Sequence, residues 1–300
     1  MNQGQLRGGE AARARAGVIG SMVIFGTIGI FRRYIPLPSS VIAMMRGMIG
    51  AAFLLALTLL RGRKLDGAAI RRCLPALCAS GAMLGFNWIL LFEAYRYTSV
   101  ATATLCYYMA PVLVILASPV LFGERLGARK IACVIAASAG MALVSGVLEA
   151  GFTGLAELRG VAFGLGAAVL YASVVLVNKR VDGVGGNDRT IMQLSLAAAV
   201  LIPYTLATED FSAIAVTPLS AGMLLLVGVV HTGVAYAMYF GSMKAVSAQS
   251  AAIMSYIDPA VAIVLSVTVL REPLSVTSLA GAVLVLGAAM ISELPEREKK

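Results

Sequence analysis

Residues 85–124, GFNWILLFEAYRYTSVATATLCYYMAPVLVILASPVLFGE, recur at residues 233–272 as GVAYAMYFGSMKAVSAQSAAIMSYIDPAVAIVLSVTVLRE. The two stretches align without a gap, and each contains two apolar segments joined by a short polar connection. The identical pairs are Gly85 and Gly233, Phe92 and Phe240, Ser99 and Ser247, Ala103 and Ala251, Tyr108 and Tyr256, Pro111 and Pro259, Ile115 and Ile263, Ser118 and Ser266, and Glu124 and Glu272. Such repetition predicts a chain built from two similar halves.

The composition places the chain in a bilayer. Apolar residues make up 59% of the 300 positions, charged residues only 13%, and the mean hydropathy is +0.88. Soluble domains typically carry about 25% charged residues. Apolar runs of roughly 17 to 25 residues span a membrane as helices. We therefore expect an all-α membrane protein with ten transmembrane helices, at residues 16–34, 39–60, 72–95, 99–122, 127–148, 158–180, 188–208, 219–242, 247–270 and 275–292.

The distribution of basic residues predicts the orientation. With a cytoplasmic N-terminus, most of the 24 Lys and Arg residues fall in cytoplasmic segments, while Arg32, Arg33 and Arg96 are among the few outside. Basic residues concentrate in cytoplasmic loops of membrane proteins, so both termini are expected in the cytoplasm. Five helices per half then make the halves, residues 1–150 and 151–300, inverted repeats. A weaker match sets FGTIGIFRR (25–33) against YASVVLVNK (171–179).

Several function classes find no support in the motifs. The chain has no GxxxxGK[ST] loop for nucleotides and no GxSxG or HExxH motif for hydrolysis. Its single histidine and four cysteines without CxxC spacing do not suggest a metal site. The net charge of +9 is explained by topology rather than by nucleic acid. We therefore expect no enzymatic activity, cofactor, metal or nucleic-acid partner, and we find no repeated charged ring typical of a passive channel.

The prolines of the repeat are the first candidate for a binding site. Pro111 and Pro259 interrupt corresponding helices, and proline frees the carbonyl four residues earlier. In membrane transporters, such interrupted helices point to a site near mid-membrane. The flanking candidates are Tyr107, Tyr108, Ser255 and Tyr256. The alternative is that these prolines only kink helices for packing.

Four further candidates lie on corresponding helices of the two halves. Trp88 and Tyr236 are a repeat pair that either lines a hydrated cavity or packs in the core, because a buried aromatic residue needs a partner for its polar tip. Asn87 and His231 suggest a shared water-filled surface between related helices. For His231 the alternative is a structural residue with an ordinary hydrogen bond, although ionisable groups inside a membrane default to function.

Arg46 and Asp258 are the charges expected well inside helices. Each costs about 2.5 to 3.5 kcal/mol at a helix centre on insertion scales, so each needs protein or water around it. Asp258 is a candidate for binding an ammonium group or for titrating during transport, and Arg46 for binding a carboxylate. Alternatively, Arg46 extends its charged end to the surface. Glu124 and Glu272 are expected to anchor loops.

Several of these features resemble the drug/metabolite transporter superfamily, and in particular its EamA-type members. The similar residues are Phe25-Gly26, Arg46, the segment PVLVILASPVLFGERL from Pro111, and its copy PAVAIVLSVTVLREPL from Pro259. Within that group the chain is most similar to YddG-type amino acid exporters of the bacterial inner membrane. Many members have tryptophan where this chain has Phe25.

The resemblance implies a function. It implies ten helices in two inverted halves around a central cavity, and export of small metabolites, amino acids with aromatic ones among them. We expect alternating access around the Pro111/Pro259 cavity, with a small-molecule substrate and the lipid bilayer as partners, in a monomer or weak homodimer. The alternative is export of another small metabolite or drug with proton coupling.

Overall fold

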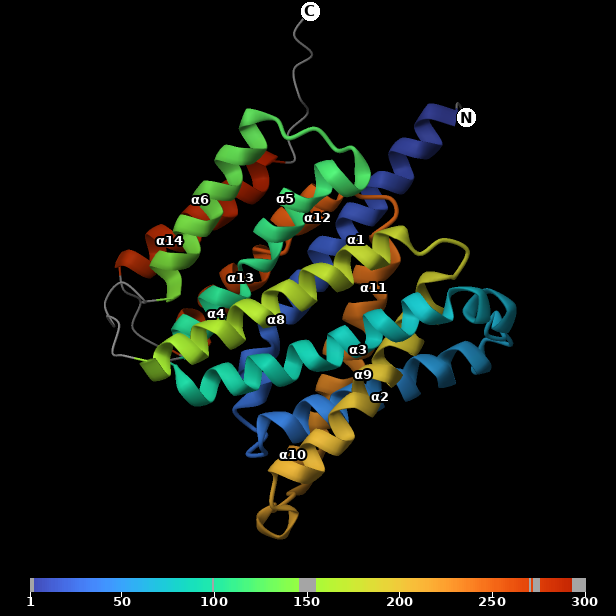
Figure 1. Cartoon of the computed structure of the whole chain (residues 1–300), viewed down its shortest axis with the longest axis vertical. Coiled ribbons are helices and arrows are strands. Elements are labelled where there is room, and N and C mark those ends of the chain that lie inside the picture. Colours follow the sequence, from blue (N-terminus) through green and yellow to red (C-terminus); the bar gives the residue numbers. More distant parts are fainter. Residues whose placement is uncertain (1–2, 99, 146–154, 270, 272–275, 293–300) are drawn as a thin grey trace, which may run out of the picture.

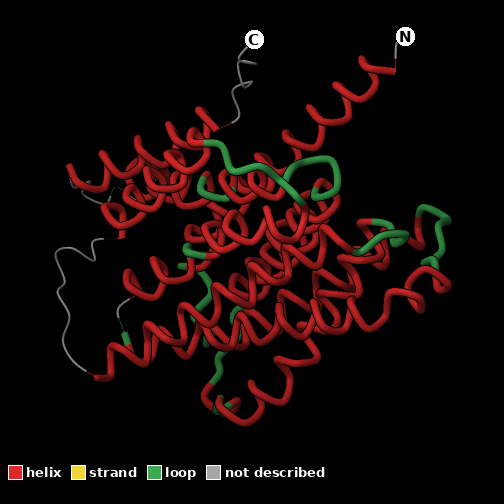
Figure 2. The backbone as a smooth tube through the Cα atoms, turned by 45° about the horizontal axis from the view of Figure 1, so that its top comes forward, coloured by secondary structure: helices red, strands yellow, loops and turns green. Residues whose placement is uncertain are grey.

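The chain is helical throughout the part that the structure describes. The computed structural model describes residues 3–98, 100–145, 155–269, 271 and 276–292, and no strand occurs in these ranges (Figure 2). The first helices are α1 (Gln3–Arg32), α2 (Ser39–Leu60), α3 (Gly67–Tyr97), α4 (Val100–Tyr107), α5 (Ala110–Phe122) and α6 (Ala128–Ser145). They are followed by α8 (Leu155–Arg180), α9 (Gly186–Thr208), η1 (Phe211–Ala213), α10 (Pro218–Leu226), η2 (Val227–Val234), α11 (Ala235–Ser242), α12 (Ala248–Met254), α13 (Ile257–Thr268) and α14 (Val276–Ser292).

The apolar helices expected from composition are confirmed. Seven helices in the described ranges are long and apolar enough to cross a membrane: Gly9–Arg32, Ser39–Leu60, Gly67–Tyr97, Leu105–Phe122, Leu158–Arg180, Gly186–Thr208 and Pro218–Ser242. The other three expected spans overlap α6, α12 with α13, and α14. Ten crossings and the orientation of the termini remain predictions. Glu272 and the boundary between the halves at residue 150 lie outside the described residues.

Both proline-containing segments are broken, as the sequence predicts. Helix α4 ends at Tyr107 and α5 begins at Ala110, while α12 ends at Met254 and α13 begins at Ile257. Each proline lies in the first turn of the second helix of its pair, where its missing N–H leaves no intrahelical bond unmade. The expected single spans 99–122 and 247–270 are therefore each two short helices.

One irregularity has no signal in the hydrophobic pattern. The expected span 219–242 contains the π-helix η2 between α10 and α11. Thr232 donates from its hydroxyl to the carbonyl of Val227, five residues earlier, at 3.3 Å. π-Helical turns, in which backbone N–H groups bond to carbonyls five residues earlier, are rare and occur frequently at functional sites. The extra residue in the turn changes which faces of this helix point inward.

Helices from the two halves of the sequence interleave. The α3 helix packs along α8 and α9, α2 packs along α9 and η2, and α1 crosses α11 and α13. At one side of the molecule α6 pairs with α14 (Figure 1). Most of the helix interfaces therefore join one half of the sequence to the other.

Glycines allow two of these interfaces to be close. A Cβ at Gly85 would lie 2.9 Å from the carbonyl oxygen of Ala197 and 2.9 Å from Cβ of Val200, both on α9. At Gly233, its copy in the repeat, a Cβ would lie 2.8 Å from the Phe53 ring. Small residues let membrane helices approach closely. Close helix packing therefore explains why both positions of this repeat pair are glycine.

Replacing Gly85 with alanine is expected to lower stability. The new methyl group meets backbone and a branched side chain that cannot easily move, and such overpacking costs roughly 1–3 kcal/mol. Gly222→Ala on α10 is the control, because a Cβ there has nothing within 4 Å. The measurement is the thermal unfolding midpoint in detergent. The packing argument fails if both variants have the same midpoint.

Candidate functional site: a central aromatic cavity

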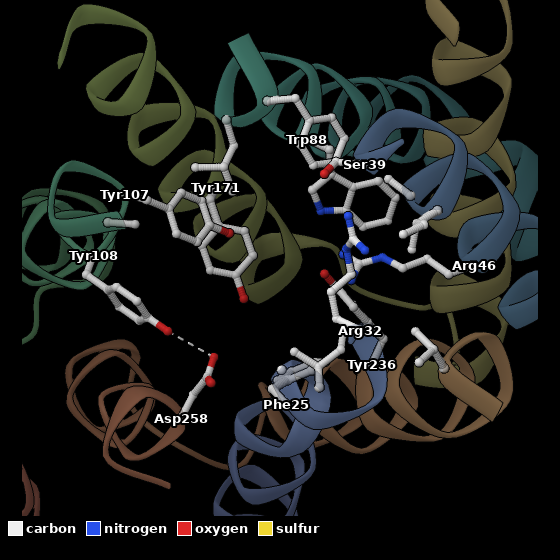
Figure 3. A pocket seen from close by; sticks show the side chains of 18 of the residues that line it. Phe25, Arg32, Ser39, Arg46, Trp88, Tyr107, Tyr108, Tyr171, Tyr236 and Asp258 are labelled. Atoms are coloured by element: carbon white, nitrogen blue, oxygen red, sulfur yellow. Dashed lines mark hydrogen bonds between the residues drawn. The ribbon is translucent and has the colours of Figure 1, made fainter. Parts of the chain in front are cut away.

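A cavity of about 350 Å³ lies between helices of both halves. Its walls come from α1, α2, α3, α8, η2 and α11, and from the two broken segments α4–α5 and α12–α13. The aromatic rings and the charged groups that Figure 3 labels surround one open space. The cavity therefore lies where the proline breaks led us to expect a site.

Most of the candidate residues line this cavity. The members of the wall that the sequence singled out are Arg46, Trp88, Tyr107, Tyr108, Pro111, Tyr236, Ser255 and Asp258. They come from α2, α3, α11 and the two broken segments α4–α5 and α12–α13. Residues that were chosen from the repeat and from the proline positions thus line the same cavity.

Four candidates lie outside the wall. Asn87 is fully buried and donates to the carbonyl of Ala167 on α8 at 2.7 Å, so it faces a helix and not the cavity. His231 lies 2.8 Å from the Thr27 hydroxyl and packs edge-on against Phe31. The expected water-filled surface shared by Asn87 and His231 is therefore absent from the cavity wall, because the two side chains face α8 and α1.

Tyr256 and Pro259 are the other two candidates outside the wall, and Tyr256 contacts a wall residue. Tyr256 is buried, stacks on Tyr108 with ring centroids 6.4 Å apart, and donates its hydroxyl to the Tyr108 carbonyl at 3.1 Å. That carbonyl lies at the break between α4 and α5, where regular helical bonding stops. Pro259 is buried at the start of α13. Tyr256 thus fixes Tyr108, its own copy in the repeat.

Aromatic rings make up much of the wall. Tyr107 and Tyr171 lie with centroids 5.7 Å apart, and Tyr236 packs edge-on against Phe25 at 5.1 Å and Trp88 at 6.4 Å. Edge-to-face and tilted pairs at these distances are favourable and hold the rings in place. The wall therefore offers a preformed stacking surface to an apolar or aromatic group.

Charged groups occupy opposite sides of the cavity (Figure 3). On one side, Tyr108 donates its hydroxyl to Oδ2 of Asp258 at 3.1 Å. On the other, the Arg46 guanidinium lies over the Trp88 ring, 4.7 Å from its centroid. Nε of Arg46 is buried without a hydrogen-bond partner. An unpartnered buried donor costs about 1–3 kcal/mol, which a bound acceptor would recover.

Arg32 and Tyr171 are two of the wall residues that the sequence candidates did not include. Arg32, expected outside the membrane, turns into the cavity while donating to the carbonyls of Ile35 at 2.5 Å and Leu37 at 3.1 Å. Tyr171 was also missed. A signal for it existed, because the weak match of 25–33 with 171–179 aligns Tyr171 with Phe25, which lines the same wall.

The far end of α5 is tied to the second half of the chain. Glu124 accepts from the backbone N–H groups of Ala248 at 2.9 Å and Gln249 at 3.3 Å, and pairs with Lys179 at 3.0 Å. Gln249 also donates to the buried hydroxyl of Ser118 at 2.8 Å. Glu124 lies just beyond the 13-residue α5, roughly 20 Å from its start. These bonds close the gap between α5, α8 and α12 at that end, and Glu124 anchors a loop as expected.

Comparison with known proteins assigns a family profile to both halves. The profile of the EamA-like transporter family matches residues 14–146 and 158–293. The uncharacterized transporter YxxF of Bacillus subtilis (strain 168) is 34% identical over 250 residues, covering 82% of this chain and 78% of that protein. An uncharacterized transporter of Archaeoglobus fulgidus is 29% identical over 289 residues, covering 96% and 97%.

A solved crystal structure has the same fold. It aligns with a TM-score of 0.84 over 94% of this chain and 97% of its own, at 20% sequence identity. At that identity the likeness concerns the fold alone.

A stability prediction follows from the buried Nε of Arg46, which has no hydrogen-bond partner. Arg46→Met removes a buried donor without a partner, so we expect the thermal midpoint in detergent to stay the same or rise. Arg189→Met is the contrasting variant, because Arg189 is buried and donates to the carbonyls of Asn178 at 2.5 Å and Phe240 at 2.7 Å. Loss of both bonds should cost about 3–6 kcal/mol, since bonds from charged donors are worth roughly 1.5–3 kcal/mol each. Equal losses in the two variants would contradict a site role for Arg46.

Proposed function

Because this chain belongs to the EamA-like transporter family, and is a multi-pass membrane transporter of small molecules, we propose that its substrates are amino acids, aromatic ones among them. It exports them as a secondary transporter of the YddG type across a bacterial inner membrane, with both termini in the cytoplasm. The names of these two relatives specify no substrate. The proposal therefore rests on the cavity.

The observation that carries the proposal is the division of charge across an aromatic cavity. A zwitterion placed between the two sides meets Arg46 with its carboxylate and Asp258 with its ammonium group. Charge-assisted hydrogen bonds of this kind are worth about 1.5–3 kcal/mol each. The side chain of the substrate then lies against Tyr107, Tyr171 and Tyr236. Pockets for ligands span about 300–1,000 Å³, so 350 Å³ suits one small metabolite.

Alternating access is proposed from the repeat and from the contacts around the cavity. The cavity walls reach the turn at residues 33–38, which supplies Ile35, whereas Glu124 and its partners join the halves at the far end of α5. Two inverted five-helix halves rocking about Pro111 and Pro259 would break these bonds and open the opposite end. The same side chains would then face the other side of the membrane.

A second candidate is export of another small metabolite or drug in exchange for protons. The observation in its favour is that Asp258 is the only carboxylate among the described residues of the cavity wall. A carboxylate inside a membrane that both substrate and proton can reach is a place where the two can compete. Facilitated diffusion and proton coupling therefore differ in what Asp258 does during the cycle.

The test is uptake of labelled phenylalanine, with threonine and a sugar phosphate alongside, into liposomes containing the purified protein. Saturable amino acid flux that ignores a pH gradient would support a facilitating exporter, whereas accumulation driven by the gradient would favour proton exchange. No amino acid flux from protein that retains its thermal midpoint would rule the substrate assignment out.

Removing the charge of Asp258 tests whether this residue binds substrate. We expect Asp258→Asn to reduce phenylalanine flux at low concentration about tenfold or more, since a lost charge-assisted bond of about 1.4 kcal/mol corresponds to tenfold. Glu10→Gln, an exposed position on α1 outside the cavity wall, is the control and should leave flux unchanged. If both variants transport like the unmodified protein, Asp258 does not bind substrate.

A further inference from the structure

The cavity wall carries an unequal number of charges. Its charged side chains, among the described residues, are Arg32, Arg46 and Asp258, so the wall holds two guanidinium groups and one carboxylate. The carboxylate already accepts a hydrogen bond from Tyr108. The cavity wall thus has an excess of positive charge that no carboxylate of the wall balances.

Neither guanidinium is paired with a carboxylate in the ranges that the structure describes. Arg46 makes its contact with the face of Trp88, and its Nε has no hydrogen-bond partner. Among the described residues, Arg32 donates to two backbone carbonyls, which carry no net charge. A guanidinium group has five N–H donors, so each arginine retains donors for an anion. Nε of Arg46 is buried without an acceptor, which is costly, and a bound anion would relieve that cost.

The turn at residues 33–38 explains why Arg32 stays in the wall. The carbonyls of Ile35 and Leu37 take one donor from each terminal nitrogen, so the guanidinium plane is fixed. Ile35 and Leu37 are themselves buried, and the turn between α1 and α2 contains Pro36 and Pro38. Proline fixes the backbone angle φ and stiffens such a turn. Arg32 is thereby preorganised, while its charge remains open to the cavity.

From this asymmetry we propose that the carboxylate, rather than the ammonium group, is what a substrate must have, and that Arg32 acts with Arg46 as a specificity-determining residue. The substrate class is then organic acids with an aromatic or aliphatic side chain, of which amino acids are the zwitterionic members. Amines without an acid group are excluded by the excess positive charge. This inference rests on the proposed function, because it concerns the same cavity.

The experiment compares three ligands that share a phenyl ring and differ in their charged groups. They are L-phenylalanine, 3-phenylpropionate without the ammonium group, and phenethylamine without the carboxylate. Trp88 is the only tryptophan of the chain and lies in the wall, so its fluorescence reports binding to the purified protein. Competition with labelled phenylalanine in liposomes gives a second reading.

The expected order follows from the charge count. Phenylpropionate should bind within about tenfold of phenylalanine, and phenethylamine about a hundredfold more weakly or worse. Arg32→Gln and Arg46→Gln should each weaken the binding of both acids. The difference in affinity between the acids and phenethylamine should therefore become smaller. Asp258→Asn should weaken the binding of phenylalanine and leave the binding of phenylpropionate nearly unchanged. Arg33→Gln, which removes the same charge one residue along the chain and outside the wall, should preserve the order.

The outcomes distinguish a failure of this inference from a failure of the amino acid assignment. Phenethylamine binding as tightly as phenylpropionate would overturn the inference while leaving amino acid transport in place. So would a response to Arg33→Gln as large as the response to Arg32→Gln. Binding of none of the three ligands would overturn the amino acid assignment and the inference together. The comparison of ligands on the unmodified protein keeps the test decisive even where a variant fails to fold.

Discussion

Inside a bilayer every backbone polar group must find a partner within the protein or in trapped water. This chain nevertheless breaks two helices, at residues 108–109 and 255–256. At the first break a side chain supplies a replacement bond, because Tyr256 donates its hydroxyl to the carbonyl of Tyr108. At the second break the backbone N–H of Ser255 still bonds to the carbonyl of Ala251 at 3.1 Å, and the Ser255 hydroxyl donates to the same carbonyl at 2.9 Å. Tyr108 and Ser255 also line the cavity, so the breaks and the site depend on each other.

The repeat provides a symmetric frame that carries asymmetric chemistry. Tyr108 and Tyr256 are copies, yet one points to Asp258 in the cavity and the other supports it from behind. The position that corresponds to Asp258 in the first copy is Ala110, which has no charge to offer. A frame of two similar halves is thus compatible with a cavity that distinguishes the acidic and basic ends of its ligand. In the proposed export cycle, the frame would supply the rocking movement, and the difference between the copies would supply the selectivity.

Sequence patterns reached the parts of the site that depend on spacing along the chain. The prolines, the neighbouring tyrosines and Asp258 were found because a break and its flanking residues are local features. Asn87 and His231 fall outside the wall because direction around a helix is not fixed by a repeat, and because His231 lies within a π-turn that shifts the register. Arg32 was missed since a basic residue at a helix end normally faces water. Only the folded turn after it returns its charge to the cavity.

The central claim is that this cavity is exposed to each side of the membrane in turn, and Ser255 in its wall offers the most direct measurement. A Ser255→Cys variant, in a chain whose four native cysteines are replaced, would be treated in oriented vesicles with a thiol reagent that cannot cross the membrane. The account predicts modification from either side, with phenylalanine slowing both reactions. Modification from one side alone, whatever the substrate gradient, would contradict it.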